Sequence, residues 1–410
     1  MFRYGIPGIL LALQILVYFN ARAWARTQHA KRPWVLRTIT LLFLLFDLPL
    51  VGMMLIRMRL NEIPEWFIIS AVYPFYVWHL AMLLIGIVVL VRSLIRLISY
   101  ILLWIPRQIR VPAARMQKIA ATPSFQKFDA SRRMFIRRSM YGVTGLSFGA
   151  SVYGLIEERS SVEFTEAEYV LPGLGAGMSG FTIALISDIH SSIFMTKEDM
   201  DRYVRLVNGL KADMIVVDGD FVNGAVEEVY PFAEAFSNLS APFGVHGVMG
   251  NHDFYNNDPE LVARTVDACG VRLLRNDKTV IEKNGSQFYL IGVDDIGRAT
   301  NAPVKLDTAI GHAPLQIPKI LLCHRPYYLP QAAARNIDLV LSGHTHGGQI
   351  VLGRIGDMTL ALASLASRYI WGNYTFNRTS MYVSRGVGTV GPPMRLNCPP
   401  EITKITLRSS

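Results

Sequence analysis

The feature that most restricts the fold of this chain is a pattern that occurs five times between residues 181 and 346. Each time, a short apolar run is followed at once by a polar motif of Asp, Asn or His residues. The motifs are Asp188-Ile-His190, Asp218-Gly-Asp220, Gly250-Asn-His-Asp253, His324 and His344-Thr-His346. Such runs indicate buried strands, and sites of α/β folds form in the loops at strand ends. The pattern therefore predicts sheets with a cluster of polar side chains beside them.

Helical patterns alternate with the apolar runs, and Lys197–Leu210 and Pro259–Cys269 are the clearest amphipathic helices. The predicted strands are Phe181–Ser187, Met214–Val217, Val245–Met249, Phe288–Val293, Ile320–Cys323, Leu339–Leu341 and Met381–Ser384. This alternation indicates a layered α/β fold with central sheets.

The five motifs together indicate a metal centre, although each alone has an ordinary explanation. A D-x-H or G-D sequence is common after a strand, and an N-H-D turn needs no metal. Six of the nine histidines, however, lie in or beside the motifs. Histidine is the commonest protein ligand for zinc-like metals, and the glycines around His344 and His346 let both side chains turn towards one point. Five such motifs in one domain are hard to explain by chance.

The order D-x-H, G-D, G-N-H-D, H and G-H-x-H resembles the calcineurin-like metallophosphoesterases over about residues 181–405. The ending, with Gly386-Val-Gly, Pro392-Pro-Met-Arg395 and Pro399-Pro-Glu401-Ile, is similar to their membrane-anchored bacterial phosphodiesterase branch. The resemblance implies a four-layer α-β-β-α sandwich over residues 181–410. It also implies hydrolysis of phosphodiester or pyrophosphate bonds by a hydroxide that bridges two metal ions. Some members of this branch and its neighbours cleave model phosphodiesters, and related enzymes act on a lipid A precursor.

The resemblance also implies a role for each site residue. Asp220 would bridge two divalent ions, and His252 would protonate the leaving oxygen or, alternatively, only orient the phosphate. The other ligands would be Asp188, His190 and His346 for one ion, and Asn251, His324 and His344 for the other. This mixture of oxygen and imidazole ligands suits Mn, Fe, Zn or Co rather than Mg or Ca. Some relatives steady this histidine with a carboxylate at the place of Asn223, and here Asp253 or Asp218 could substitute.

Other polar residues are weaker candidates. Arg325 and Arg395 could bind a substrate phosphate or could form structural salt bridges. His246 is expected to be a packed strand residue and His312 a surface residue. Asp294-Asp295 are expected to form a turn.

The first 160 residues form the predicted membrane region. Apolar runs at about 4–20, 38–56 and 66–91 are each near the length of about 20 residues that crosses a bilayer. Basic loops follow the first and third runs, and the positive-inside tendency predicts that both loops are cytoplasmic. The N-terminus is then expected outside. Asp47 lies within the second run and is either a functional intramembrane carboxylate or a residue near a helix end.

Arg132-Arg133 precede the weakly apolar stretch Met140–Leu155. This arrangement resembles an internal twin-arginine export signal, or it is the basic flank of an ordinary fourth span. Either interpretation puts the remainder of this multi-pass membrane protein on the extracytoplasmic side. Residues 161–180 are predicted to be a linker into the catalytic domain, because they are polar and end in a glycine-rich stretch.

Charge and composition bound the partners of the chain. Residues 1–140 hold 19 basic and four acidic residues, whereas the remainder holds 22 basic and 27 acidic residues. This asymmetry and the mean hydropathy of +0.29 indicate a bilayer rather than nucleic acid as the partner. Three unpaired cysteines indicate no thiolate metal site. A substrate linked to a lipid or envelope precursor is the hypothesis, and the oligomeric state stays open. The alternatives are a metal-binding sensor without turnover and a transporter.

Overall fold

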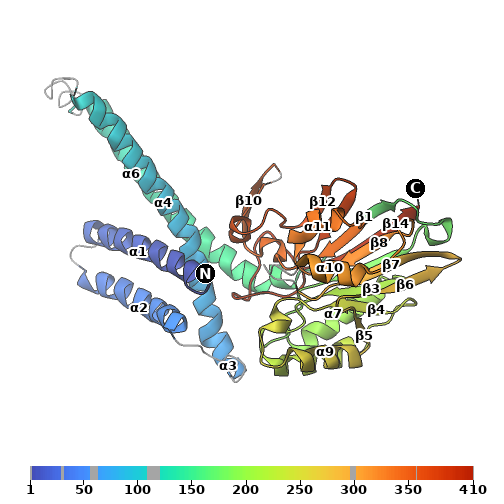
Figure 1. Ribbon diagram of the computed structural model, residues 1–410. Coiled ribbons are helices and arrows are strands. Elements are labelled where there is room, and N and C mark those ends of the chain that lie inside the picture. The colour runs from blue at the N-terminus through green and yellow to red at the C-terminus, as the bar shows by residue number, and fades with distance from the viewer. Residues whose placement is uncertain are drawn as a thin grey trace. The chain divides into compact units, whose positions relative to one another are not determined.

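A computed structural model gives the fold of residues 2–28, 32–55, 63–108, 121–295, 302–356 and 358–409 (Figure 1). The chain divides into two units, Met1–Tyr153 and Gly154–Ser410. The first unit is helical, and the second unit is α/β. Parts of the two predicted basic loops, residues 29–31 and 109–120, lie outside the described residues.

The α/β unit contains two six-stranded sheets and a separate hairpin. The first sheet has the order β1 (Glu163–Leu171), β14 (Glu401–Ser409), β2 (Thr182–Ile186), β3 (Met214–Asp218), β4 (Val245–Val248) and β5 (Val271–Leu273). The second has the order β12 (Gly372–Phe376), β13 (Thr379–Val383), β9 (Leu339–Ser342), β8 (Lys319–Leu322), β7 (Ser286–Gly292) and β6 (Asp277–Lys283). The hairpin joins β10 (Val351–Ile355) to β11 (Met358–Ala361). Every strand predicted from an apolar run is therefore present, with ends within two residues of the prediction.

The strands that carry the predicted motifs are parallel within each sheet. In the first sheet β2, β3 and β4 run parallel, with Ile186 opposite Val217. In the second sheet β8 and β9 run parallel, with Leu322 opposite Leu341. Parallel strands end at the same edge of a sheet, so the loops that follow them are neighbours.

Helices cover the outer faces of both sheets. The helices are α7 (Lys197–Gly209), α8 (Val229–Phe236), α9 (Pro259–Ala268), α10 (Ala302–Ile310) and α11 (Leu329–Ala333). Short 3-10 helices lie at Glu158–Ser160 (η2), Ala176–Met178 (η3), Val226–Glu228 (η4), His252–Phe254 (η5), Pro326–Tyr328 (η6), His346–Gly348 (η7) and Leu362–Leu365 (η8). Thr196 and Asp199 form a capping box that starts α7, and Asp258 caps α9.

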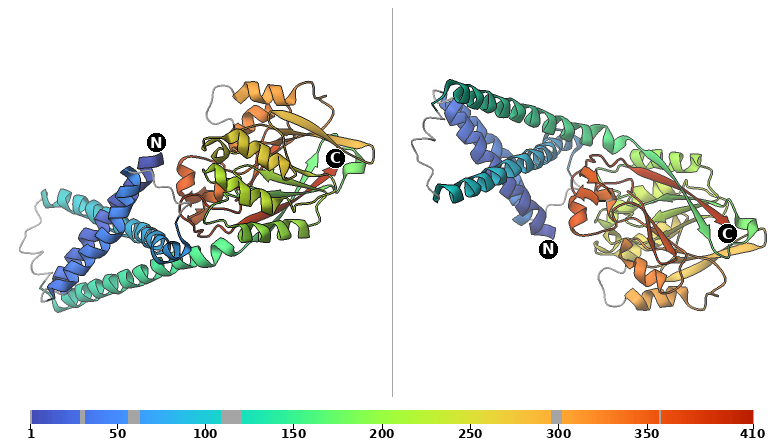
Figure 2. Two further views of the ribbon diagram at one scale, coloured as in Figure 1. Left: turned by 90° about the horizontal axis from the view of Figure 1, so that it is seen from below. Right: turned by 90° about the horizontal axis from the view of Figure 1, so that it is seen from above.

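Alternation along the strands produces the layers. In β2, Ile183 and Leu185 pack between the two sheets, whereas Ala184 and Ile186 pack against α7, α8 and α9. On the second sheet, residues such as Leu321 face a separate core formed with α10 and α11. The result is the predicted four-layer α-β-β-α arrangement (Figure 2).

The stretch predicted to be a linker contains a long strand. Along its whole length β1, at 163–171, pairs in parallel with β14, near the end of the chain (Figure 1). The polar sequence was misleading because β1 is an edge strand, whose side chains are largely exposed. The expectation of a linker over residues 161–180 is therefore wrong for its first half, which belongs to the first sheet.

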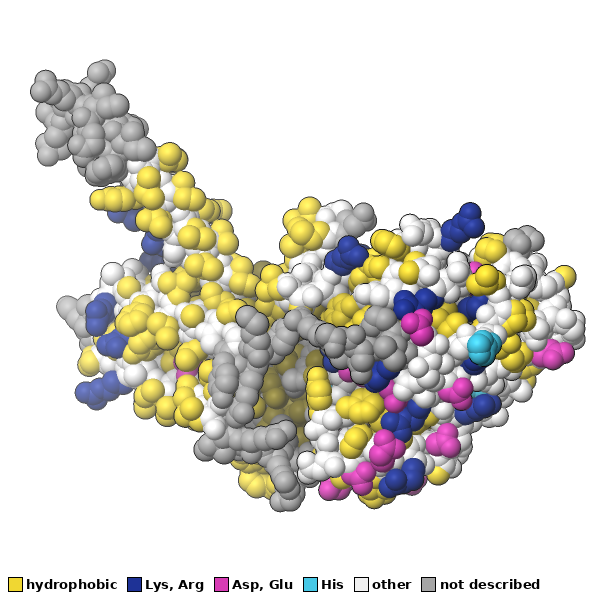
Figure 3. Space-filling view, viewed as in Figure 1, with side chains coloured by type: hydrophobic (Ala, Val, Ile, Leu, Met, Phe, Trp, Pro, Cys, Tyr) yellow, Lys and Arg dark blue, Asp and Glu magenta, His cyan; other side chains and the backbone are white. Residues whose placement is uncertain are grey.

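The helical unit contains α1 (Phe2–Gln28), α2 (Pro33–Leu55), α3 (Glu65–Phe67), the π-helical turn η1 (Ile68–Val72), α4 (Tyr73–Gln108) and most of α6 (Pro123–Ile156). A cluster of buried side chains joins α1, α2 and α4, and includes Val17, Phe43 and Trp78. Hydrophobic side chains cover much of the visible surface of these helices (Figure 3).

Three helical stretches among the described residues are long and apolar enough to cross a membrane: Gly5–Gln28, Pro33–Leu55 and Glu65–Leu102. They coincide with the three predicted apolar runs. The predicted fourth span lies in α6, which is not one of these stretches. Asp47 lies inside α2, two residues before Pro49.

Candidate metal centre

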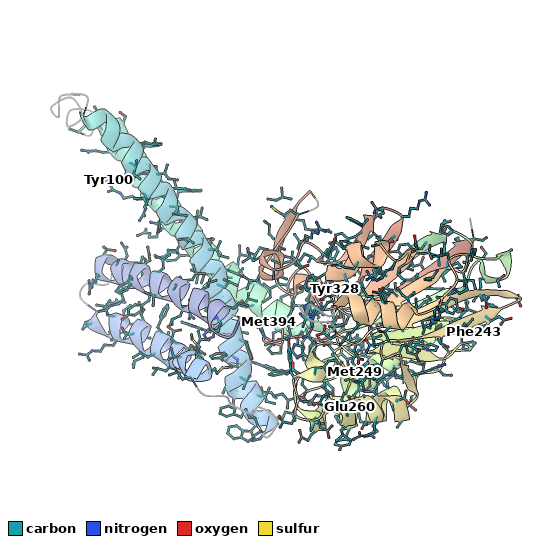
Figure 4. All side chains as sticks on the ribbon, in the orientation of Figure 1. Tyr100, Phe243, Met249, Glu260, Tyr328 and Met394 are labelled. Atoms are coloured by element: carbon teal, nitrogen blue, oxygen red, sulfur yellow. The ribbon has the colours of Figure 1, made fainter. Side chains whose placement is uncertain are left out.

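The predicted ligands all lie in loops that follow strands. Asp188 and His190 follow β2, Asp220 follows β3, Asn251 and His252 follow β4, His324 follows β8, and His344 and His346 follow β9. Figure 4 shows the two ends of β4, with Phe243 before the strand and Met249 directly after it. Tyr328, which follows His324, lies on the Met249 side. The two sheets thus present their site loops at one end of the unit.

The backbone of the site is strained at five of the predicted ligands. Asp188, His190, Asp220, His344 and His346 have φ angles between 51° and 73°. This left-handed region is uncommon for residues other than glycine and asparagine, and it costs free energy. The surrounding structure must hold these residues in place, which is typical of functional sites.

Two glycines leave room for the site side chains. A Cβ atom at Gly219, where φ is 76°, would lie 2.6 Å from Nδ1 of His324. A Cβ atom at Gly250 would collide with the backbone and carboxylate of Asp220. The glycines are therefore needed for close approach between site loops.

The first cluster contains Asp188, His190 and His346, which are all buried. Nε2 of His190 lies 3.0 Å from Nε2 of His346, and Nε2 of His346 lies 3.3 Å from Oδ1 of Asp188. The hydroxyl of Ser187 and the backbone N–H of His344 donate hydrogen bonds to the Asp188 carboxylate. These contacts fix the orientation of the carboxylate towards the histidines.

The second cluster contains Asp220, His324 and His344. Nε2 of His324 lies 3.1 Å from Oδ2 of Asp220. The predicted ligand Asn251 is buried, and its Oδ1 has no hydrogen-bond partner among the described residues. The next N–H along the chain, that of His252, donates to Asp220, so this loop lies against the same carboxylate.

Asp220 belongs to both halves of the site. Its Oδ2 lies 3.5 Å from Nε2 of His190 in the first cluster and 3.1 Å from Nε2 of His324 in the second. His190, Asp220 and His252 form a third group in which the candidate ligand atoms lie within 4.8 Å of one another. One carboxylate is therefore placed between the histidines of two clusters.

The protonation pattern of these residues fits a bound cation. Nδ1 of His324 lies 2.7 Å from the carbonyl oxygen of Asp218 and can only donate to it. In the neutral ring, Nε2 is then an acceptor, and it faces the acceptor Oδ2 of Asp220. Two buried acceptors at this distance need a proton or a cation between them. The residues present therefore fit a divalent metal ion with a hydrogen bond that orients its ligand.

The shifted pKa values of His324 and Asp220 also indicate that a positive charge is favoured between these two side chains. Burial alone would lower the pKa of His324, but the Asp220 carboxylate outweighs burial and holds this pKa well above its usual range. Burial would raise the pKa of Asp220, but His324 and the other imidazoles hold it well below its usual range. By contrast, burial lowers the pKa of His344 strongly and that of His346 to about 4. These two rings are neutral near pH 7, as metal ligands must be.

His252 is held by main-chain groups. Its Nδ1 donates to the carbonyl oxygen of Asn223 at 2.6 Å, and Glu228 accepts hydrogen bonds of 2.8–2.9 Å from three N–H groups of residues 223–225. Asp253 instead accepts from the N–H groups of Val222 and Gly250. The expectation that Asp253 or Asp218 substitutes for a carboxylate at position 223 is therefore not supported. The carbonyl group of Asn223 takes that place.

Both arginine candidates make structural contacts. Arg325 forms a two-point ion pair with Asp295, at 2.6 and 3.2 Å. Arg395 is fully buried and donates to the main-chain oxygens of residues 385, 386, 388 and 398. Because these contacts occupy the guanidinium of Arg395 inside the unit, its prediction as a substrate-binding residue gives way to a structural role.

The remaining predicted residues are placed as follows. His246 is buried, and its Nε2 lies 3.0 Å from the carbonyl oxygen of Phe243, whereas His312 is exposed. Asp294 lies two residues beyond β7, and it accepts hydrogen bonds from Arg275 in an ion pair. Sequence reasoning missed Ser187 and Glu228. Neither residue carries a signal in the sequence, because their contacts depend on the folded loops.

Comparison with known proteins identifies relatives of the α/β unit. The family model described as calcineurin-like phosphoesterase matches residues 181–348. An uncharacterized metallophosphoesterase of Bacillus subtilis, YkuE, is 30% identical over 68% of this chain and 98% of its own length. A transmembrane protein with metallophosphoesterase domain from Danio rerio is 30% identical over 63% of this chain. The phosphodiesterase YaeI of Escherichia coli is 29% identical over 55% of this chain and 82% of its own length.

Some relatives are longer than the matched region. The match covers 60% of the Danio rerio protein, 48% of a putative metallophosphoesterase of Caenorhabditis elegans and 65% of a transmembrane relative from Bos taurus. The similarity to these proteins therefore concerns part of their length.

Proposed function

This chain belongs to the calcineurin-like metallophosphoesterase family, and from that premise we propose that it hydrolyses phosphodiester or pyrophosphate bonds with two divalent metal ions. The observation that carries the proposal is the position of Asp220 between His190 and His324. A carboxylate shared by two clusters is what a pair of closely spaced cations requires.

The proposed ligands divide between the two ions. Asp188, His190 and His346 would hold one ion, Asn251, His324 and His344 would hold the other, and Asp220 would bridge them. Mn, Fe, Zn and Co all accept such a set of oxygen and nitrogen ligands. When bound, the ions supply Lewis acidity to the phosphate oxygens and lower the pKa of a water molecule.

In this proposal His252 handles the proton of the leaving group. Its Nδ1–H remains on the carbonyl oxygen of Asn223, so Nε2 is the atom that can give a proton to the departing oxygen. The main-chain N–H of His252 donates a hydrogen bond to Asp220, and this contact keeps the ring next to the proposed metal ligands. Positioned proton transfer of this kind contributes roughly 10²–10⁴-fold to the rate.

The experiment is a comparison of two carboxylate variants in the full-length protein. Asp220→Asn should lose bound metal, and hydrolysis of a chromogenic phosphodiester should fall by roughly a thousandfold, because several kcal/mol of charge stabilisation disappear. Asp277→Asn changes an exposed carboxylate at the start of β6 and should keep both properties. Full metal content and full activity in Asp220→Asn would exclude the shared-ligand proposal. Bound metal without hydrolysis of any phosphodiester by the unmodified protein would instead favour the metal-binding sensor.

We also propose that the substrate is linked to a lipid or a cell-envelope precursor. Three apolar helical stretches in the same chain support attachment to a bilayer. The test is a screen of phospholipids, lipid-linked pyrophosphates and nucleotides in mixed micelles. Cleavage of nucleotides without cleavage of any lipid phosphate would contradict the lipid hypothesis and leave the phosphoesterase proposal intact.

The proposed topology is multi-pass with the α/β unit outside the cytoplasm, which requires α6 or an export signal to move the chain across. Labelling by a membrane-impermeant thiol reagent of a cysteine placed at exposed Leu315 tests it in intact cells. Labelling without permeabilisation is expected. Labelling only after permeabilisation would place the α/β unit in the cytoplasm and would contradict the proposed topology.

A further inference from the structure

The segment after the last metal ligands exposes many apolar side chains. We call β10, β11 and η8 together the apolar hairpin, which is residues 351–365 without residue 357. Its exposed large apolar side chains are Leu352, Ile355, Met358, Leu360, Leu362 and Leu365. Leu365 is 83% exposed and Ile355 is 64% exposed. Within the described residues β10 and β11 pair only with each other, so neither main sheet explains these side chains. Large apolar side chains that are exposed on one short segment indicate a binding surface.

The residues around the apolar hairpin have the chemistry of a membrane interface. Between residues 351 and 371 the sequence has two arginines, Arg354 and Arg368, and one acidic residue. The guanidinium of Arg354 lies 4.6 Å from the ring centre of Trp371, and that of Arg368 lies 4.7 Å from the ring of Tyr369. Tryptophan is enriched where a bilayer meets water, and Trp371 is partly exposed, whereas Tyr369 is buried. Arginine can bury its stem while its charge stays near the headgroups.

The apolar hairpin is attached directly to the candidate metal centre. β10 begins five residues after His346, and η8 contacts η7, the turn that contains His346. The hydroxyl of Thr345, between the ligands His344 and His346, donates to the carbonyl group of Ile370 just beyond the hairpin. A surface that holds the hairpin would therefore hold the metal centre close to it.

We propose that the apolar hairpin inserts into the headgroup region of a phospholipid bilayer that contains anionic lipids. The bilayer is favoured as the occupant because three membrane-crossing candidates in the same chain keep the α/β unit near one. Arg354 and Arg368 complement anionic headgroups. Insertion next to His346 would let the centre take phosphate groups from the bilayer surface. Only this last step rests on the proposed phosphoesterase function.

Spin labels in the full-length protein test the insertion without using activity. The protein carries Cys269→Ser, since Cys323 and Cys398 are buried, and is placed in nanodiscs of phosphatidylcholine and phosphatidylglycerol. A label at Leu365→Cys should be relaxed mainly by oxygen, which dissolves in lipid. A label at Leu315→Cys, which is 71% exposed between α10 and β8, should be relaxed mainly by a water-soluble nickel complex. Equal behaviour of the two labels would overturn the proposal. Label–label broadening at Leu365 that increases with protein copies per disc would also overturn it, because a second copy would then be the occupant.

Activity with two substrates separates this proposal from the proposed function. Leu352→Ser together with Leu365→Ser should reduce hydrolysis of a bilayer-embedded phosphodiester roughly tenfold, since two apolar anchors are lost. Hydrolysis of a soluble chromogenic diester should stay unchanged, because neither side chain is a proposed ligand. Loss of both activities equally, or of neither, would contradict the role of the hairpin in taking substrate from lipid. Absence of both activities in the unmodified protein would contradict the phosphoesterase proposal, while the spin-label result would still stand.

Discussion

The two units of this protein depart from the usual distribution of side chains in opposite ways. In the helical unit large apolar side chains lie on the outside, as Leu41, Leu45 and Leu48 of α2 show. In the α/β unit charged and polar side chains lie inside, where Asp188, Asp220 and His324 are buried together.

Each departure costs free energy in water and so indicates what else must be present. Apolar residues on the outside of a helix are stable when the surroundings are lipid. Buried carboxylates and imidazoles are stable when a cation or a proton lies between them. The surface of the helical unit therefore fits a lipid surrounding, and the buried cluster of the α/β unit fits a cation. The apolar hairpin is the part of the α/β unit whose exposed side chains resemble those of the helical unit.

The largest expected effect concerns His252 in the buried polar centre. His252→Gln should slow hydrolysis of a diester with an alkyl leaving group by roughly 10²–10⁴-fold, because the departing alkoxide then lacks a proton donor. A nitrophenyl ester, whose leaving group needs no proton, should lose much less. The measurement is kcat for both esters, with exposed His312→Gln as the control. Equal losses for both esters would show that His252 only orients the phosphate.

The next largest effect is expected for a charge placed on the exposed surface of the helical unit, compared with a charge on the surface of the α/β unit. Leu45 in the middle of α2 and Leu315 in the α/β unit are both more than 60% exposed. Leu45→Lys should disfavour membrane insertion by about 2.5–3.5 kcal/mol if α2 faces lipid. Leu315→Lys should change stability by less than about 0.5 kcal/mol, because its surroundings are water. The membrane-integrated fraction and the thermal unfolding temperature are the measurements, and equal tolerance of both variants would contradict the assignment of α2 to lipid.

A smaller effect is expected at Glu228, which acts on the polar centre from a distance. Its carboxylate accepts a hydrogen bond from the main-chain N–H of Asn223, and the carbonyl oxygen of Asn223 accepts the hydrogen bond from Nδ1–H of His252. Glu228→Gln should lower kcat for the alkyl ester by roughly tenfold, since supporting residues of metal sites typically contribute 10–100-fold. Exposed Glu227→Gln is the matched control. If the loss were the same for the nitrophenyl ester, Glu228 would stabilise the loop without positioning His252.

The strands were predicted correctly, and the candidate ligands were predicted to lie together, because both predictions depend on local patterns. A short apolar run such as Leu339–Leu341 indicates a buried strand. The polar residue that follows each such run therefore lies at the end of a sheet. The edge strand β1 was missed because its partner, β14, is more than 200 residues away and its exposed side chains have no apolar pattern. Contacts of backbone groups, such as Asn223 with His252, leave no trace in side-chain identity.

The arginine candidates show a further limit of prediction from sequence. Arg395 lies in the proline-rich ending of the chain, and its position in the sequence alone allowed it to face the substrate. Its partners are main-chain oxygens, which every residue possesses, so nothing in the sequence marks them. The direction in which a long side chain points is decided by loops that only the folded chain arranges.

The smallest expected effect tests how the helical unit packs. A Cβ atom at Gly86 of α4 would lie 2.9 Å from Cβ of Leu13 in α1, whereas one at Gly52 of α2 would meet no atom of the described structure within 4 Å. Both positions are helical, so Gly→Ala alone is worth up to about 1 kcal/mol of helix stability. Gly52→Ala should therefore raise the thermal unfolding temperature in detergent, and Gly86→Ala should lower it because α1 and α4 must separate. Equal stabilisation by both substitutions would show that α1 and α4 do not depend on this close contact at a small residue.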